Sequence, residues 1–149
     1  MKYKLKIFLL CMCNIVVLNL FGCGLDNDVT YIERAFYEKD ESASTVVIKD
    51  DEVLKQFKDS NSMSDEMQQS LLKYDKDYFK DKMIVVVSHW ENSGSNTIEV
   101  EEVEIKEGIV AVRLERESQD DVTDDMKNWG IIIELEKDNT VEQVVVRIE

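Results

Sequence analysis

The sequence predicts a mainly β (α+β) domain. We expect an antiparallel sheet, or a small sandwich or barrel, of about six or seven strands, with two short helices between the second and third strands. Short apolar runs, most of them alternating with polar residues, recur after residue 82. Four large side chains at helical spacing precede them, between residues 63 and 74. The 149 residues include no proline, so the turns must come from Gly, Asn and Asp.

The amino-terminal segment differs from the rest of the chain. Lysines at positions 2, 4 and 6 precede an apolar run over residues 7–21. A basic stub followed by about 7–15 apolar residues is typical of a secretory signal, whereas a permanent span needs roughly 18 or more. Leu20-Phe21-Gly22-Cys23 resembles the lipobox of bacterial lipoproteins. That resemblance implies a signal peptide over residues 1–22, cleavage between Gly22 and Cys23, and diacylglycerol on the Cys23 sulfur.

The first half of the predicted domain combines strands and helices. Residues 29–38 and 45–48 are rich in β-branched and aromatic side chains and are expected to form strands joined by a polar loop. Two aspartates then offer a cap for a helix over residues 52–58. A second helix is expected to begin at Ser62 or Ser64. Its stripe is expected to pack in the core rather than bind a ligand, and consists of Met63, Met67, Leu71 and Tyr74.

The second half is predicted to be sheet. The continuous apolar run 83–87 is typical of a strand buried on both faces. Between residues 98 and 105 the apolar alternation changes parity at Glu101-Glu102, which predicts a β-bulge. The remaining expected elements are a hairpin turn at 106–108, a strand over 109–117, a strand around 131–135, a turn at 138–139 and a strand around 144–148.

The predicted mature protein is strongly acidic. It comprises a short tether, residues 23–28, and a single acidic domain, residues 29–149. The net charge of the whole chain is −14, and it becomes −17 once the three signal lysines are removed. Such a charge repels phosphate backbones and anionic lipid, so we expect no nucleic-acid binding and membrane contact only through the lipid. Basic partners or loosely held divalent cations are compatible with it; a merely solubilising surface is the alternative.

The sequence contains no recognisable catalytic or metal-binding motif. His89 is the only histidine, which excludes a histidine-based metal cluster, and we expect it to be structural. Ser93-Gly94-Ser95 lacks the glycines that flank the serine of a nucleophile elbow. The aspartates after residue 119 could attract calcium, but they lack the spacing of an EF-hand. We therefore expect a non-enzymatic protein with no metal and no cofactor besides the covalent diacylglycerol.

Two polar loops are the candidate binding surface. Residues 91–96 and 118–128 each interrupt predicted strands, and binding residues often lie on loops that a rigid scaffold positions. Plain connecting loops are the alternative. The candidate residues are Glu91, Asn92, Ser93, Gly94, Ser95, Asn96, Asp120, Asp121, Asp124 and Asp125.

Several segments resemble the PrcB carboxy-terminal domain family, bacterial surface domains named for a lipoprotein subunit of a surface protease complex. The similarity covers roughly residues 46–135, with soft, mainly hydrophobic motifs. This chain departs from the family in lacking the proline before its glycine loop and the one near Trp129. The resemblance implies a β-rich fold and a surface location. It is carried by residues 47–54, by the segment 77–87 (DYFKDKMIVVV), by the glycine-containing loop and strand 93–100, and by residues 122–123 and 129–133.

These features predict a lipoprotein anchored in the cell membrane and facing the extracytoplasmic side. We expect it to bind or stabilise a partner protein at the cell envelope, a protease being one candidate. A peptidase inhibitor that presents a loop to an active site is one alternative. A module that binds cations or a wall polymer is another, motivated by the charge of −17.

Overall fold

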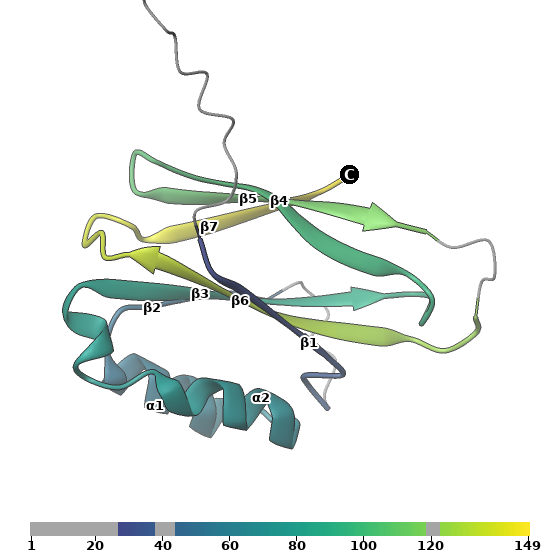
Figure 1. The fold of residues 1–149 in the computed structure, drawn as a ribbon, viewed down its shortest axis with the longest axis horizontal. Coiled ribbons are helices and arrows are strands. Elements are labelled where there is room, and N and C mark those ends of the chain that lie inside the picture. The colour runs from purple at the N-terminus through teal and green to yellow at the C-terminus, as the bar shows by residue number, and fades with distance from the viewer. Residues whose placement is uncertain (1–26, 38–43, 119–122) are drawn as a thin grey trace, which may run out of the picture.

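Strand β3 (Lys82–Glu91) lies inside the molecule, and its apolar run is buried on both faces, as predicted. The computed structural model describes residues 27–37, 44–118 and 123–149 (Figure 1). β3 pairs antiparallel along its whole length with β6 (Lys127–Glu136). Two edge strands, β1 (Val29–Glu33) and β2 (Thr45–Ile48), complete an antiparallel sheet of order β1-β6-β3-β2.

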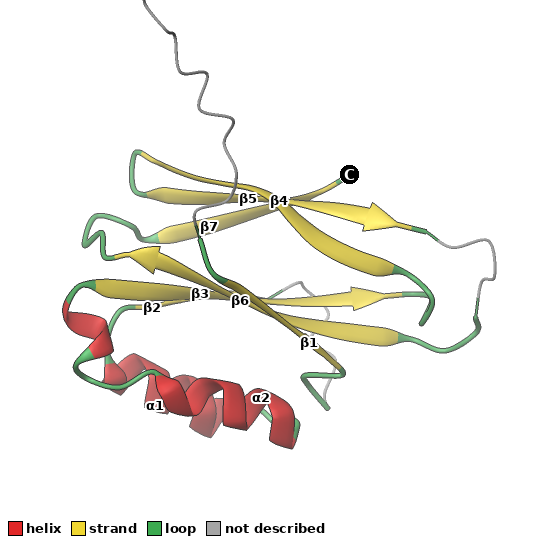
Figure 2. Cartoon of the chain, viewed as in Figure 1, coloured by secondary structure: helices red, strands yellow, loops and turns green. Residues whose placement is uncertain are grey.

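A second sheet packs on this one and confirms the sandwich among the predicted architectures (Figure 2). It consists of β4 (Thr97–Lys106), β5 (Ile109–Glu117) and β7 (Gln143–Ile148), in the order β4-β5-β7. β4 and β5 form the predicted antiparallel hairpin. β7 pairs parallel with β5, which is an exception to the antiparallel pattern. After β5 the chain crosses to the other sheet, forms β6 there, and returns to add β7 beside β5.

Two apolar layers hold these parts together. Successive residues of β3 and β6 point to opposite faces of the four-stranded sheet, so each strand contributes to both layers. Each fully buried Val, Ile, Leu or Met side chain contributes about 1.5–3 kcal/mol to stability. Ile84, Val86 and Ile132 pack beneath the helices, whereas Met83, Val85, Val87, Ile131, Ile133 and Leu135 pack between the two sheets.

Two short helices lie between β2 and β3 and cover the outer face of the four-stranded sheet (Figure 2). They are α1 (Asp51–Ser60) and α2 (Asp65–Ser70), and the carboxylate of Asp50 and the hydroxyl of Ser64 cap their amino termini. Two 3₁₀ turns, η1 (Leu71–Lys73) and η2 (Tyr78–Lys80), lead into β3. No helix among the described residues is long and apolar enough to span a membrane. The predicted stripe packs in the core, since Met63, Met67, Leu71 and Tyr74 are all buried.

Local signals place the bulge and the hairpin turn where the sequence predicts them. The β4–β5 register shifts between Val100 and Glu102. At the bulge the Val100 amide donates to Tyr31 Oη at 2.9 Å, which links the edge strands of the two sheets. Glu107 and Gly108 form the turn with positive φ angles of 52° and 79°. Two consecutive positive φ angles are the geometry of a tight hairpin turn.

Strand β1 is shorter than the expected strand over residues 29–38. It ends at Glu33 because Arg34 adopts a φ of 53°, which no strand can continue. Beyond it, the Asn128 side chain accepts from the Phe36 amide and donates to the Phe36 carbonyl, both at 2.8 Å. The expected loop after this strand lies mostly outside the described residues.

Candidate functional site

The described parts of the two candidate loops, residues 91–96 and 123–128, lie together at one end of the sandwich, at the right of Figure 1. Ser93, between β3 and β4, is buried, and its hydroxyl accepts a hydrogen bond from the Thr123 amide at 3.1 Å. The Ser93 Oγ also lies 2.8 Å from Ser95 Oγ. The contact therefore joins the β3–β4 loop to the connection between β5 and β6, two segments 30 residues apart in sequence.

A second contact between the loops is made where the Asp125 side chain packs against Gly94. A Cβ atom at Gly94 would lie 2.4 Å from Asp125 Oδ2, so a larger residue at position 94 would have to displace the Asp125 carboxylate. The Asp125 carboxylate accepts hydrogen bonds from the Thr123 hydroxyl, from its own backbone amide and from the Gly94 amide. Together with the Arg34 guanidinium 3.8 Å away, these hydrogen bonds lower the pKa of the Asp125 carboxyl below its ordinary value. The two loops thus support each other.

A buried carboxylate lies beneath the loops. The Glu91 side chain is 2 % exposed and lies 2.6 Å from His89 Nε2. It also accepts hydrogen bonds from Asn96 Nδ2 at 2.8 Å and from Arg116 Nε at 2.9 Å. Burial by itself would raise the pKa of Glu91, but the hydrogen bonds from Asn96, His89 and Arg116 outweigh it and hold the pKa below the ordinary value. This cluster ties the end of β3 to the start of β4 and the end of β5.

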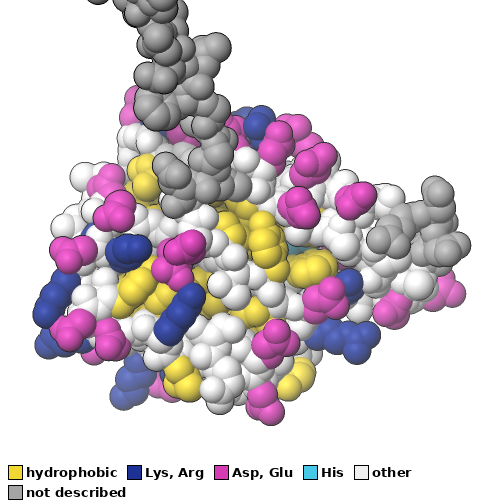
Figure 3. Space-filling model, viewed as in Figure 1, with side chains coloured by type: hydrophobic (Ala, Val, Ile, Leu, Met, Phe, Trp, Pro, Cys, Tyr) yellow, Lys and Arg dark blue, Asp and Glu magenta, His cyan; other side chains and the backbone are white. Residues whose placement is uncertain are grey.

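The sequence-predicted residues separate into supporting and exposed groups. Glu91, Ser93 and Asn96 make the contacts that position the loops, whereas Asn92, Asp124 and Asp125 are exposed to solvent. Gly22, Cys23, Asp120 and Asp121 lie outside the described residues. Among the residues that the structure describes, no three His, Cys, Asp or Glu side chains gather as metal ligands would. Acidic side chains are spread over both sheets on the face shown in Figure 3.

Three residues of this end were missed from sequence: Arg34, Arg116 and Thr123. The position of Arg116 could have been predicted from the sequence. It is the next alternate residue of β5 after Val110, Val112 and Leu114, whose side chains point inward. A charged residue at an inward position needs a buried partner of opposite charge. Glu91 has the same signal on β3, where it continues the parity of Met83 to Val87 and His89. Nothing in the sequence indicates the contacts of Arg34 and Thr123.

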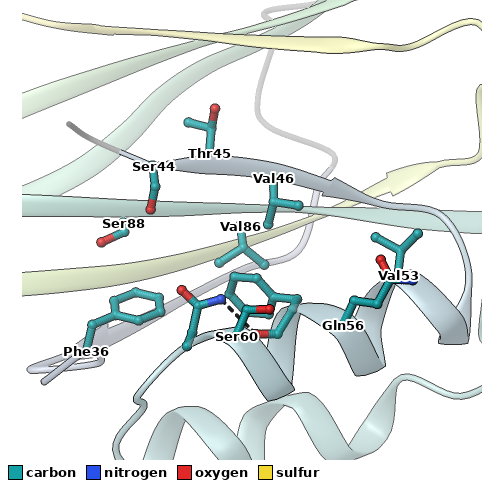
Figure 4. A pocket seen from close by; sticks show the side chains of 11 residues that line it. Phe36, Ser44, Thr45, Val46, Val53, Gln56, Ser60, Val86 and Ser88 are labelled. Atoms are coloured by element: carbon teal, nitrogen blue, oxygen red, sulfur yellow. Dashed lines mark hydrogen bonds between the residues drawn. The ribbon is translucent and has the colours of Figure 1, made fainter. Parts of the chain in front are cut away.

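A separate cavity of about 320 Å³ lies on the helical side of the four-stranded sheet (Figure 4). It is bounded by α1, by β2 and β3, and by Phe36. Val46, Val53, Phe57 and Val86 form its apolar wall, and hydroxyl and amide groups form the rest. None of the lining side chains is charged: Phe36, Ser44, Thr45, Val46, Val53, Gln56, Phe57, Ser60, Asn61, Val86 and Ser88.

Comparisons of the chain with protein-family models, with curated proteins and with solved structures give no match.

Proposed function

We propose that the chain is a non-enzymatic lipoprotein that binds a partner protein at the cell envelope through the loop end of its sandwich. The observation that carries this proposal is the joining of two polar loops over a buried, hydrogen-bonded carboxylate. Loops held in one conformation lose little conformational entropy on binding, so their contacts contribute more fully to affinity. Asn92 and Asp124, exposed at this end, are the residues that we expect to touch the partner.

The membrane anchor is the second part of the proposal, and it rests on the sequence. Leu20-Phe21-Gly22-Cys23 supplies the cysteine for lipidation, and two acyl chains hold a protein stably on a bilayer whereas one chain holds it only marginally. The resemblance to the PrcB carboxy-terminal domain family supports the same location and makes a surface protease one candidate partner. The anchor keeps the domain, whose surface is acidic, close to envelope proteins.

Site-specific cross-linking in the native membrane tests both parts. A photoreactive amino acid is placed at Asn92, just after β3, with a matched protein carrying it at Asp81, an exposed residue just before the other end of the same strand. We expect one protein adduct from position 92, none from position 81, and loss of the adduct in Cys23→Ala. Equal labelling from both positions, or no adduct from either, would contradict the proposed surface.

A peptidase inhibitor is the second candidate, favoured by the contacts between the described parts of the two loops. The contacts Ser93–Thr123 and Gly94–Asp125 hold the loops in place, as a loop that enters an active site requires. Addition of the purified chain to any protease captured by cross-linking separates the candidates. An inhibitor blocks hydrolysis of a small peptide substrate, whereas a stabilising partner leaves the turnover unchanged and slows thermal inactivation.

A further inference from the structure

The uncharged cavity beside α1 lies along an edge strand of the four-stranded sheet. β2 is the last strand of that sheet, and no strand of the described residues pairs with its outer edge. The Ser88 amide donates to the Ser44 carbonyl at 2.8 Å, so residues 44, 46 and 48 direct their main-chain groups toward β3. Because hydrogen bonding alternates along an antiparallel strand, Thr45 and Val47 direct theirs to the outer edge, away from β3.

The side chains of the same strand alternate between two directions. Figure 4 shows Ser44 and Val46 pointing toward the helices and Thr45 pointing to the opposite side. Thr45 therefore borders the cavity with its main chain rather than with its side chain. Residues Thr45, Val46 and Val47 are all partly exposed. A row of main-chain groups that no strand of the described residues pairs with and a cavity for a side chain thus lie next to each other.

We propose that an extended segment of a partner polypeptide adds to the outer edge of β2 and places one uncharged apolar side chain in the cavity. In this mode of recognition, main-chain hydrogen bonds supply affinity and pockets for alternate side chains supply specificity. The site is distinct from the loop end.

The cavity itself favours a side chain over a cofactor. Its volume of about 320 Å³ is at the lower end of the range for small-molecule pockets, roughly 300–1,000 Å³. Its wall of Val46, Val53, Phe57 and Val86 suits a branched or aromatic group, and its uncharged lining would leave a charged group without a partner. Beyond the cavity, the chain's net charge of −14 favours a segment with lysine or arginine at its ends.

Fluorescence anisotropy with synthetic peptides tests the proposal on the purified full chain in detergent. The probes are fluorescein-labelled nonapeptides of threonine with a lysine at each end and one central residue, which is Ala, Val, Leu, Ile, Met, Phe or Asp. We expect saturable binding that is at least tenfold tighter for the best apolar centre than for Ala. We expect no binding for Asp, and a loss of binding when alternate peptide amides are N-methylated.

Two matched variants show whether the cavity is the binding site. Gln56→Phe places a ring at the cavity rim, whereas Gln69→Phe makes the same change at an exposed position of α2 that does not line the cavity. We expect Gln56→Phe to weaken peptide binding at least tenfold and Gln69→Phe to leave it unchanged. Circular dichroism confirms that both variants fold.

Three outcomes would overturn the proposal. One is that no peptide of the set binds at millimolar concentration. Another is that affinity does not depend on the central residue or on Gln56→Phe. The third is that the chain sediments as a dimer that Gln56→Phe separates, because the edge would then belong to a second copy of the chain. Hydrogen exchange gives an independent readout, since bound peptide should slow exchange of the Thr45 and Val47 amides.

Discussion

At the scale of single residues, the buried carboxylate of Glu91 and the partly buried carboxylate of Glu134 organise opposite ends of the sandwich. Glu91 accepts hydrogen bonds from Asn96 and Arg116 and contacts His89 beneath the loops. Glu134 accepts hydrogen bonds from Lys73, Tyr74 and Tyr78 at the helical side. A buried charge is tolerated only when it is paired and hydrogen-bonded, and both carboxylates meet that condition.

Glu91→Gln is expected to lower the free energy of unfolding by about 1–3 kcal/mol. The substitution keeps the shape of the side chain but removes the charge that Arg116 and His89 face. Urea denaturation measures the change. Glu104→Gln serves as the matched control, because Glu104 is an exposed residue of β4 that lies opposite Ala111 of β5. We expect this control to change the free energy of unfolding by less than about 0.5 kcal/mol. Equal effects of the two variants would show that the buried cluster adds nothing.

The stability provided by Glu134 should depend on pH. Burial acts to raise the pKa of Glu134, but the hydrogen bonds from Lys73, Tyr74 and Tyr78 lower it below the ordinary 4.5. The unfolded chain therefore binds more protons in acid, and the contribution is complete above about pH 4.5 and lost as the pH falls through the folded-state pKa. The stability difference between wild type and Glu134→Gln should shrink between about pH 6 and pH 3. Glu136→Gln, exposed on the same strand, is the control, and a pH-independent Glu134→Gln difference would refute the prediction.

At the scale of elements, the β4–β5 hairpin contains a residue that suits its turn poorly. Glu107 adopts a φ of 52° and precedes Gly108 at 79°. A left-handed conformation costs an ordinary residue roughly 1–2 kcal/mol, and asparagine tolerates it better than glutamate does. At Gly108 a Cβ atom would lie 2.7 Å from the Thr140 carbonyl oxygen, so only glycine fits.

Glu107→Asn should therefore stabilise the protein, by up to about 1 kcal/mol, because it creates the preferred Asn-Gly turn. Gly108→Ala should destabilise it by at least about 1 kcal/mol, since it adds both strain and a clash. Thermal unfolding followed by circular dichroism measures both changes. If Glu107→Asn lowered the melting temperature, the turn geometry described above would be wrong.

The elements that the sequence predicts well are those with local signals. The cap at Asp50, the bulge after Val100 and the turn at Gly108 each follow from residues within a few positions. The end of β1 at Glu33 and the parallel pairing of β7 with β5 depend on contacts distant in sequence, such as the one between Phe36 and Asn128. The loop end was predictable in part, because its loops are polar, but their mutual contacts through Ser93 and Gly94 are tertiary.

At the scale of the whole molecule, the net negative charge destabilises the folded state. The chain carries 32 acidic and 18 basic side chains. Like charges on a folded surface repel one another, and added salt screens them over a Debye length of about 8–10 Å. Asp124 and Asp125, both exposed, add to this repulsion, and among the described residues no three acidic, His or Cys side chains gather as metal ligands would.

The melting temperature should therefore rise with sodium chloride between about 0.01 and 0.15 M ionic strength. Calcium chloride at equal ionic strength should produce the same rise, because screening and not coordination is responsible. Differential scanning fluorimetry makes the comparison. A clearly larger rise with calcium would instead favour the cation-binding alternative, and Asp124→Asn would then be the first variant to measure.

The parallel pairing of β7 with β5 also governs the order in which the protein can fold. Between these strands the chain must complete β6 in the other sheet, and pairing with β5 extends as far as Glu149, whose amide donates to the Leu114 carbonyl. Long-range pairings form late, because the entropy of loop closure must be overcome before they stabilise anything. If the chain crosses the membrane with its amino terminus first, the second sheet therefore cannot be completed until β7, its last strand, has crossed. Under the proposed export route, the domain reaches its native state only after passage through the membrane.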